Sequence, residues 1–133
     1  MEKIDFQVSE EDRKDIVKRT YRFALRILYI VNKFPKNVLT YRTIYQLIGC
    51  GTSIGSNTEE ASAGFSKSDF TFKMSVASKE ARETNYFLRL LRDSGLIKDK
   101  SLLNDILEAI DESNEIKKIL TSIVKTSQTK AGK

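Results

Sequence analysis

Apolar residues recur at alternating steps of three and four in two consecutive stretches, Tyr41–Phe65 and Ser66–Arg92. This spacing is typical of a helix that packs one side against other helices. The two stretches therefore predict an antiparallel helical hairpin, with a capping box at residues 66–69 that starts the second helix. The predicted seams are Ile44, Leu47, Gly51, Ile54, Thr58, Ala61 and Phe65 in the first stretch, and Phe70, Met74, Ala77, Ala81, Thr84, Leu88 and Leu91 in the second.

One further helix is predicted before this hairpin and another after it. A second capping-box pattern at residues 9–12 starts the earlier helix, and Pro35 ends it near Phe34. Gly95 is a natural C-terminal stop for the third helix, and the connection Leu96–Lys100 leads into the fourth. The predicted seams are Ile16, Thr20, Phe23, Ile27, Ile30 and Phe34 in the first helix, and Leu102, Ile106, Ala109, Ser113, Ile116, Leu120 and Ile123 in the last.

Four long helices with short connections predict an all-α, antiparallel up-down-up-down four-helix bundle. We expect residues 1–8 to form an N-terminal arm, 9–125 the bundle, and 126–133 a disordered basic tail. The single cysteine, Cys50, cannot form an internal disulfide, which is consistent with a reducing cytoplasm. No apolar run approaches the ~18 residues that a membrane span needs, so a cytoplasmic location is expected.

Two features predict close contacts with neighbours. Gly49, Gly51 and Gly55 lie within one predicted helix, where each costs ~1 kcal/mol relative to alanine. Together with Ser53 and Ser56 they indicate that another backbone approaches closely. The first helix also carries apolar residues well beyond one face, which indicates a subunit interface. These additional residues are Val17, Ala24, Leu25, Leu28 and Val31.

Basic residues exceed acidic ones by 23 to 18, and several of them follow one face of the first helix. A row of cations with an aromatic residue for stacking is typical of a nucleic-acid interface. The alternatives are a solvated helix back, or arginines that pair with the acidic fourth helix of a neighbouring subunit. The predicted nucleic-acid-binding residues are Lys14, Lys18, Arg19, Arg22, Arg26, Tyr29 and Lys33.

Catalytic and metal sites are not expected. The chain has no histidine, so neither a Glu-x-x-His di-iron site nor a histidine-activated nucleophile can form. One cysteine without histidine also excludes a typical zinc site. A site made only of carboxylates, from Glu60, Glu80 and Glu83, is disfavoured because hard metal ions usually bind loop oxygens as well. The sequence therefore predicts a protein that is not an enzyme and has no cofactor.

Several polar residues lie close to the apolar seams of the hairpin. If partly buried they must be hydrogen-bonded or paired, with Arg42, Lys79 or Arg82 as possible partners. They are interpreted either as a network that fixes helix register or as a site for a ligand or partner. These residues are Ser53, Asn57, Glu60, Glu80 and Glu83.

The same segments resemble a known family. Residues 53–61 are similar to the signature S-I-x-x-N-I-x-E-[GA], and 69–77 and 80–88 resemble D-F-x-x-K-[LM]-x-I-A and E-A-x-E-T-x-Y-W-L. This is the bacterial family of 23S rRNA intervening-sequence proteins, four-helix bundles related to the accessory variability protein of diversity-generating retroelements. This sequence has Thr58 where the family signature has an aliphatic residue, and Phe87 where it has a tryptophan.

The resemblance implies a homopentamer, and motif residues that are structural rather than catalytic. It implies no enzymatic activity, whereas the related variability protein is a basic pentamer that binds reverse transcriptase and RNA. We therefore predict a non-enzymatic oligomeric bundle that binds structured RNA, or a complex of nucleic acid and protein, through its basic face. The alternative is a protein-interaction scaffold that binds no nucleic acid. Exposure of Lys14, Lys18, Arg22 and Arg26 in the oligomer would distinguish the two.

Overall fold

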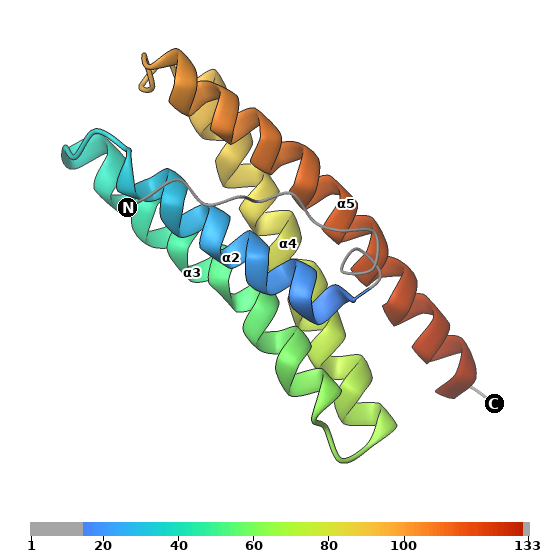
Figure 1. The fold of residues 1–133 in the computed structure, drawn as a ribbon. Coiled ribbons are helices and arrows are strands. Elements are labelled where there is room, and N and C mark those ends of the chain that lie inside the picture. The colour runs from blue at the N-terminus through green and yellow to red at the C-terminus, as the bar shows by residue number, and fades with distance from the viewer. Residues whose placement is uncertain (1–14, 132–133) are drawn as a thin grey trace.

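The computed structural model describes residues 15–131, and the regular structure in this range is helical (Figure 1). Consecutive helices run in opposite directions, and their short connections alternate between the two ends of the molecule. The helices are α2 (Ile16–Asn32), α3 (Val38–Ser62), α4 (Lys67–Asp93) and α5 (Lys100–Ala131).

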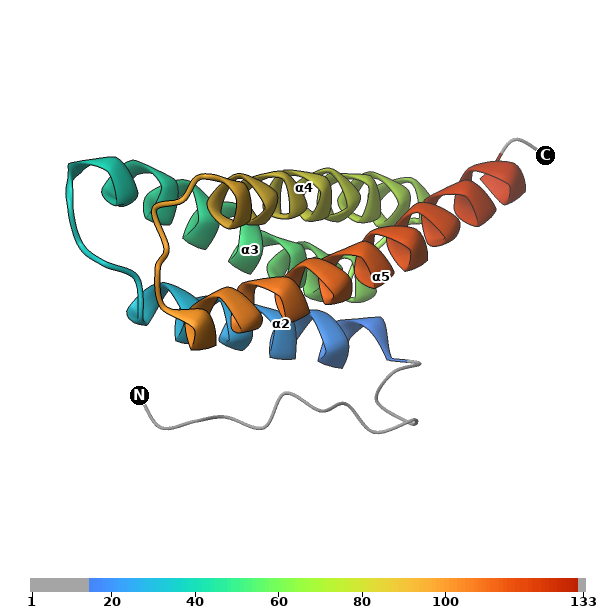
Figure 2. The same cartoon turned by 90° about the horizontal axis from the view of Figure 1, so that it is seen from above.

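Each helix packs against two others, so the four close into a bundle. α2 contacts α3 and α5, and α4 also contacts α3 and α5. Seen from above, α5 begins beside α2 and extends past it on the side of α4 (Figure 2). This arrangement confirms the predicted four-helix bundle.

The predicted seams form one hydrophobic core. Most of their members are buried, and Ile16, Ile44, Phe70 and Ile123 are partly buried against the core. The alternating spacing keeps one side of each helix turned towards its neighbours. Phe65 is an exception: α3 ends at Ser62, and the side chain of Phe65 is fully exposed in the connection that follows. The largest fully buried side chains are Phe23, Ile27, Ile30, Leu47, Ile54, Met74, Leu88, Leu91, Leu102, Ile106, Ile116 and Leu120.

The ends of the hairpin helices follow their local capping residues. The Ser66 hydroxyl accepts a hydrogen bond of 3.0 Å from the backbone N–H of Asp69, as the sequence predicts. Gly95 follows α4 with a φ of 76°, a left-handed conformation that suits glycine and confirms the predicted stop. α3 begins at Val38, directly after Asn37, which forms a capping box with Thr40.

The N-terminal start of the bundle is set by Asp15. Its carboxylate accepts hydrogen bonds from the backbone N–H groups of Val17 and Lys18. The predicted capping pattern at 9–12 and the predicted arm at 1–8 lie outside the described residues.

The C-terminal boundary differs from the prediction. α5 continues to Ala131, so the segment 126–131 is helical and the prediction of a disordered tail from residue 126 is wrong there. This segment is helical because it packs against α4: Ser127 is buried, and its hydroxyl contacts the hydroxyl of Thr71 on α4. A polar composition alone did not reveal this helix–helix contact.

The predicted close approach of a neighbouring backbone occurs at Gly55, where α3 meets α2, whereas Gly51 packs against a side chain of α2. A Cβ on Gly51 would lie 2.9 Å from Cγ1 of Ile27, and one on Gly55 would lie 3.2 Å from the carbonyl oxygen of Thr20. At Gly49 no atom would lie within 4 Å of an added Cβ, so close packing within this chain does not explain that glycine.

Substitution by alanine at Gly55 and at Gly49 should therefore have opposite effects on the free energy of unfolding. Gly55→Ala should lower the free energy of unfolding by about 1–3 kcal/mol, because the added methyl group presses on the α2 backbone. Gly49→Ala should raise it by up to about 1 kcal/mol through helix propensity alone. Urea unfolding followed by circular dichroism measures both, and equal stability of the Gly55→Ala variant and the wild type would contradict the packing argument.

Candidate nucleic-acid interface

Three of the predicted basic residues face α5 and pair with acids of the same chain. Arg19 makes two hydrogen bonds to Glu112, with Nε–Oε2 at 2.9 Å and Nη2–Oε1 at 2.7 Å. Further along α2, the other pairs are Arg26–Glu108, with Nη1–Oε2 at 3.5 Å, and Lys33–Asp105, with Nζ–Oδ2 at 3.1 Å. We refer to these three pairs as the α2–α5 ladder.

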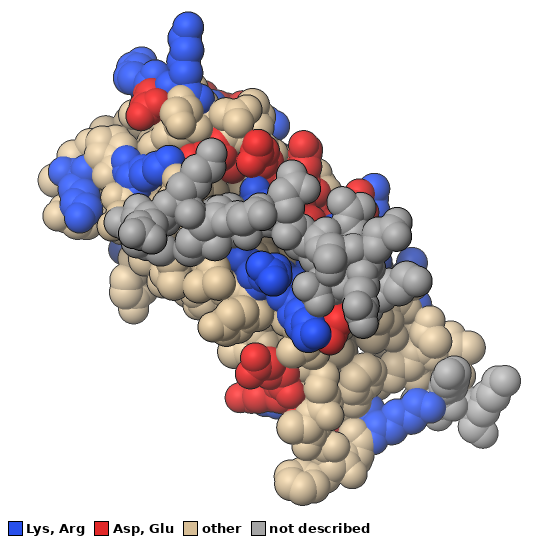
Figure 3. Space-filling model, viewed as in Figure 1, with Lys and Arg blue, Asp and Glu red and all other residues tan. Residues whose placement is uncertain are grey.

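The ladder is partly withdrawn from solvent. The side chains of Arg19 and Glu112 are only 11% and 17% exposed. The hydrogen bond from Arg19 to Glu112 raises the pKa of Arg19, although burial opposes the charged form. Figure 3 shows acidic side chains gathered along the first half of α5. Two of these acids, Glu108 and Glu112, pair with cations of α2.

Tyr29 is not available as a stacking surface. Its side chain is buried, and Nζ of Lys33 lies 4.4 Å from the centre of its ring. The Tyr29 hydroxyl and then Asp105 raise the pKa of Lys33. The pairing that the sequence analysis considered between subunits is therefore found within one chain.

The remaining described members of the basic row lie towards α3. Lys18 is exposed and Arg22 is half-buried, and both line a groove of about 330 Å³ with Tyr21, Leu25 and Glu59 among its other residues. Lys14 lies outside the described residues. The structure therefore divides the predicted basic row between two sides of α2 instead of presenting it as one surface.

The predicted polar network is mostly local to each helix. The hydroxyl of Ser53 donates to the backbone carbonyl oxygen of Gly49 at 2.6 Å. The side-chain amide of Asn57 donates to the backbone carbonyl oxygen of Ser53 at 2.8 Å. Between helices, Glu60 pairs with Lys73 at 2.8 Å, which raises the pKa of the lysine. The predicted partners Arg42, Lys79 and Arg82 form no ion pair with other described residues.

Glu80 and Glu83 lie near Cys50 at the α3–α4 interface. Burial raises the pKa of Glu80, and the neighbouring Glu83 raises it further. Burial also raises the pKa of the Cys50 thiol, which the Thr84 hydroxyl partly offsets. A thiol held neutral in this way is a poor nucleophile.

Hydroxyl and amide contacts that the sequence analysis did not identify connect the helices. Thr20 and Thr58 share a buried hydrogen bond of 2.8 Å between α2 and α3. Between α4 and α5, the Asn85 amide donates to the Ser113 hydroxyl at 2.9 Å. The available signal was the position of Thr20, Thr58 and Ser113 within otherwise apolar seams.

A second basic surface lies between α4 and α5, and the sequence analysis missed it. It is a groove of about 550 Å³, and none of its four cations forms an ion pair with another described residue. The missed signal was the spacing of three lysines over about two turns in the second half of α5. We call this surface the α4–α5 groove; its residues are Arg82, Lys117, Lys118, Thr121, Ser122, Lys125 and Thr126.

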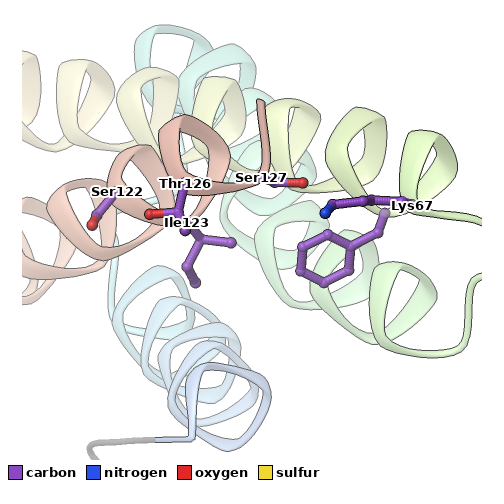
Figure 4. A pocket seen from close by; sticks show the side chains of 6 residues that line it. Lys67, Ser122, Ile123, Thr126 and Ser127 are labelled. Carbon is purple, nitrogen blue, oxygen red and sulfur yellow. The ribbon is translucent and has the colours of Figure 1, made fainter. Parts of the chain in front are cut away.

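A smaller pocket adjoins the groove towards the end of α5 (Figure 4). It measures about 340 Å³ and shares Ser122 and Thr126 with the α4–α5 groove, while Lys67 and Phe70 line it from α4. The hydroxyl-bearing residues of α5 thus line both hollows.

The described residues offer no metal centre, because no group of three potential histidine, cysteine or carboxylate ligands gathers among them. None of the helices between residues 15 and 131 is long and apolar enough to cross a membrane.

The geometry defines an all-α four-helix bundle with a self-neutralised face and a separate basic groove. The chain matches the 23S rRNA-intervening sequence protein family over residues 12–122, and it belongs to that family. This confirms the resemblance seen in the sequence motifs.

A solved structure agrees with this assignment. It is the crystal structure of a protein of unknown function from the S23 ribosomal protein family of Bacteroides thetaiotaomicron VPI-5482. It superimposes with a TM-score of 0.69 and 34% sequence identity, covering 83% of this chain and 98% of that chain. No curated protein matches the chain significantly.

Removing acids from the α2–α5 ladder should affect stability unequally. Glu112→Gln should lower the free energy of unfolding by about 1–3 kcal/mol, because the Glu112 carboxylate is only 17% exposed and accepts two hydrogen bonds from Arg19. Glu108→Gln is the matched control: Glu108 is 59% exposed, and an exposed ion pair contributes at most about 1 kcal/mol. Urea unfolding of both variants measures the difference, and equal destabilisation would contradict a special role for the Arg19 pair.

Proposed function

We propose that this protein is a non-enzymatic RNA-binding protein whose phosphate-binding surface is the α4–α5 groove. The observation that carries the proposal is the set of four cations, Arg82, Lys117, Lys118 and Lys125, in a groove of about 550 Å³. No described acid pairs with them. Lysine and arginine neutralise backbone phosphates, and serine and threonine hydroxyls commonly donate to phosphate oxygens.

The charge distribution supports this location over the predicted α2 row. The ladder matches Arg19, Arg26 and Lys33 one to one with acids, so these cations contribute little net charge to the surface. The chain nevertheless has a net charge of +5, and the groove gathers four cations in one place. A concentrated positive surface of this kind raises both the affinity and the association rate for a polyanion.

Family membership supports RNA as the polyanion. The family is described by its relation to intervening sequences of 23S rRNA. The proposal that the protein is not an enzyme is supported by the lack of histidine and by the burial that raises the pKa of the Cys50 thiol.

Salt dependence of RNA affinity tests the groove. The affinity of the wild type for a structured RNA hairpin should fall steeply between about 50 and 200 mM salt. In the variant Lys117→Ala, Lys125→Ala, the slope of log K against log salt should decrease by about 2, because two phosphates are no longer neutralised. Fluorescence anisotropy with a labelled hairpin measures both slopes.

Two control variants locate the effect. Lys98→Ala, Lys100→Ala removes the same charge at the opposite end of α5 and should leave the slope nearly unchanged. Lys18→Ala, Arg22→Ala, Arg26→Ala tests the α2 row and should change the slope less than the groove variant. If the wild type binds no RNA at low salt, the proposal of RNA binding is wrong and the protein-interaction scaffold becomes the better hypothesis.

We also propose that the protein self-associates through α2, as the homopentamer implied by the family resemblance. Tyr21 and Leu28 remain exposed on this helix, whereas Val17, Ala24 and Leu25 are half-buried and Val31 is buried. The apolar surface available to a neighbour is therefore smaller than the sequence analysis expected.

Light scattering tests the assembly directly. The mass at micromolar concentration should correspond to five copies, and Tyr21→Glu, Leu28→Glu should reduce it because charge is placed in an apolar contact. A monomeric wild type would contradict self-association, and an unchanged mass for the variant would place the interface elsewhere.

A further inference from the structure

Two tyrosines stand exposed on the outer side of α3. Tyr41 and Tyr45 are 59% and 78% exposed, and their separation of four residues places them one turn apart on the same face. Together with Val38, Arg42 and Gln46 they line a groove of about 510 Å³. We call these five residues the α3 tyrosine face.

The fold makes no evident use of these two rings. Among residues 15–131, no side chain stacks on either ring or hydrogen-bonds to either hydroxyl. Tyr86, by contrast, packs its ring against that of Phe87. Exposed aromatic surface of this kind is typical of a binding site, because a partner removes it from water and fills the groove.

The surrounding charge favours an anionic occupant. No aspartate or glutamate occurs between Ile16 and Thr58, whereas Arg42 lies within the face and Lys36 shortly before it. The acids of α5 belong to a helix that α3 does not contact, and Asp93, the acid at the end of α4, is paired with Arg92. A second copy docked symmetrically on this face would bring two Arg42 side chains together, which disfavours a twofold dimer here.

We infer that the α3 tyrosine face binds unpaired bases of RNA, an inference that rests on the proposed function and extends it to single-stranded segments. Tyr41 and Tyr45 would stack on successive bases, Arg42 would contact the backbone or a base face, and the Gln46 amide would hydrogen-bond a base edge. The α4–α5 groove binds only phosphates in this scheme and treats paired and unpaired RNA alike.

Affinity for two RNA probes tests the inference. The probes are an oligouridylate without base pairs and a blunt duplex with the same number of phosphates. In Tyr41→Ala, Tyr45→Ala, affinity for the oligouridylate should fall about 5- to 150-fold for each base that no longer stacks on a ring. Affinity for the duplex should stay within about twofold of the wild type, because its bases are paired and do not reach the rings. Tyr41→Phe, Tyr45→Phe is the matched control and should retain binding to both probes, because the rings remain.

Intrinsic tyrosine fluorescence gives a second measurement, since the chain has five tyrosines and no tryptophan. Oligouridylate should quench the emission of the wild type more strongly than that of the alanine variant, because stacked bases quench the two exposed rings. Circular dichroism and thermal unfolding should show that the alanine variant folds like the wild type, since both side chains are exposed.

The outcomes separate this inference from the proposed function. If the wild type binds neither probe, RNA binding itself is wrong. If it binds both probes and the alanine variant binds oligouridylate equally well, the base-stacking inference is wrong while the groove remains. If the alanine variant changes the mass in light scattering and leaves RNA affinity unchanged, the face binds protein, which also overturns the inference.

Discussion

The close approach of α2 to α3 determines how the other surfaces are arranged. At Gly55 the two backbones come so near that a methyl group would press on the carbonyl of Thr20, and the Thr20 hydroxyl bonds to that of Thr58. A polar bond at such a contact fixes both the depth and the rotation of α2. That rotation turns Arg19 towards α5 and leaves Lys18 on the side of α3.

The fold was largely predictable because each helix must bury one side, and this requirement alone places apolar residues at steps of three and four along its sequence. Residues such as Ile27, Ile54, Leu88 and Ile116 could be assigned to the core from spacing alone, and the structure confirms them. The errors lie at ends, where the outcome depends on one contact. Phe65 falls beyond the last turn of α3, and Ser127 continues a helix because α4 lies beside it.

The candidate sites were less predictable because they depend on register between helices. Spacing placed Arg19, Arg26 and Lys33 along α2, but only the packed structure shows that acids of α5 lie opposite them. The α4–α5 groove was missed for a related reason. Arg82 of the groove comes from α4 and the three lysines come from α5, so neither helix alone shows a basic row.

The contact between α4 and the second half of α5 has an unusual chemical character. Ser78 meets Thr121 and Thr71 meets Ser127, so hydroxyl pairs join the helices where most bundles use branched apolar side chains. A hydroxyl that leaves such a pair can bond to water instead, and separation there costs less than opening an apolar seam. The α4–α5 groove lies beside these hydroxyl pairs, so a small separation of the two helices there exchanges hydroxyl–hydroxyl bonds for bonds to water.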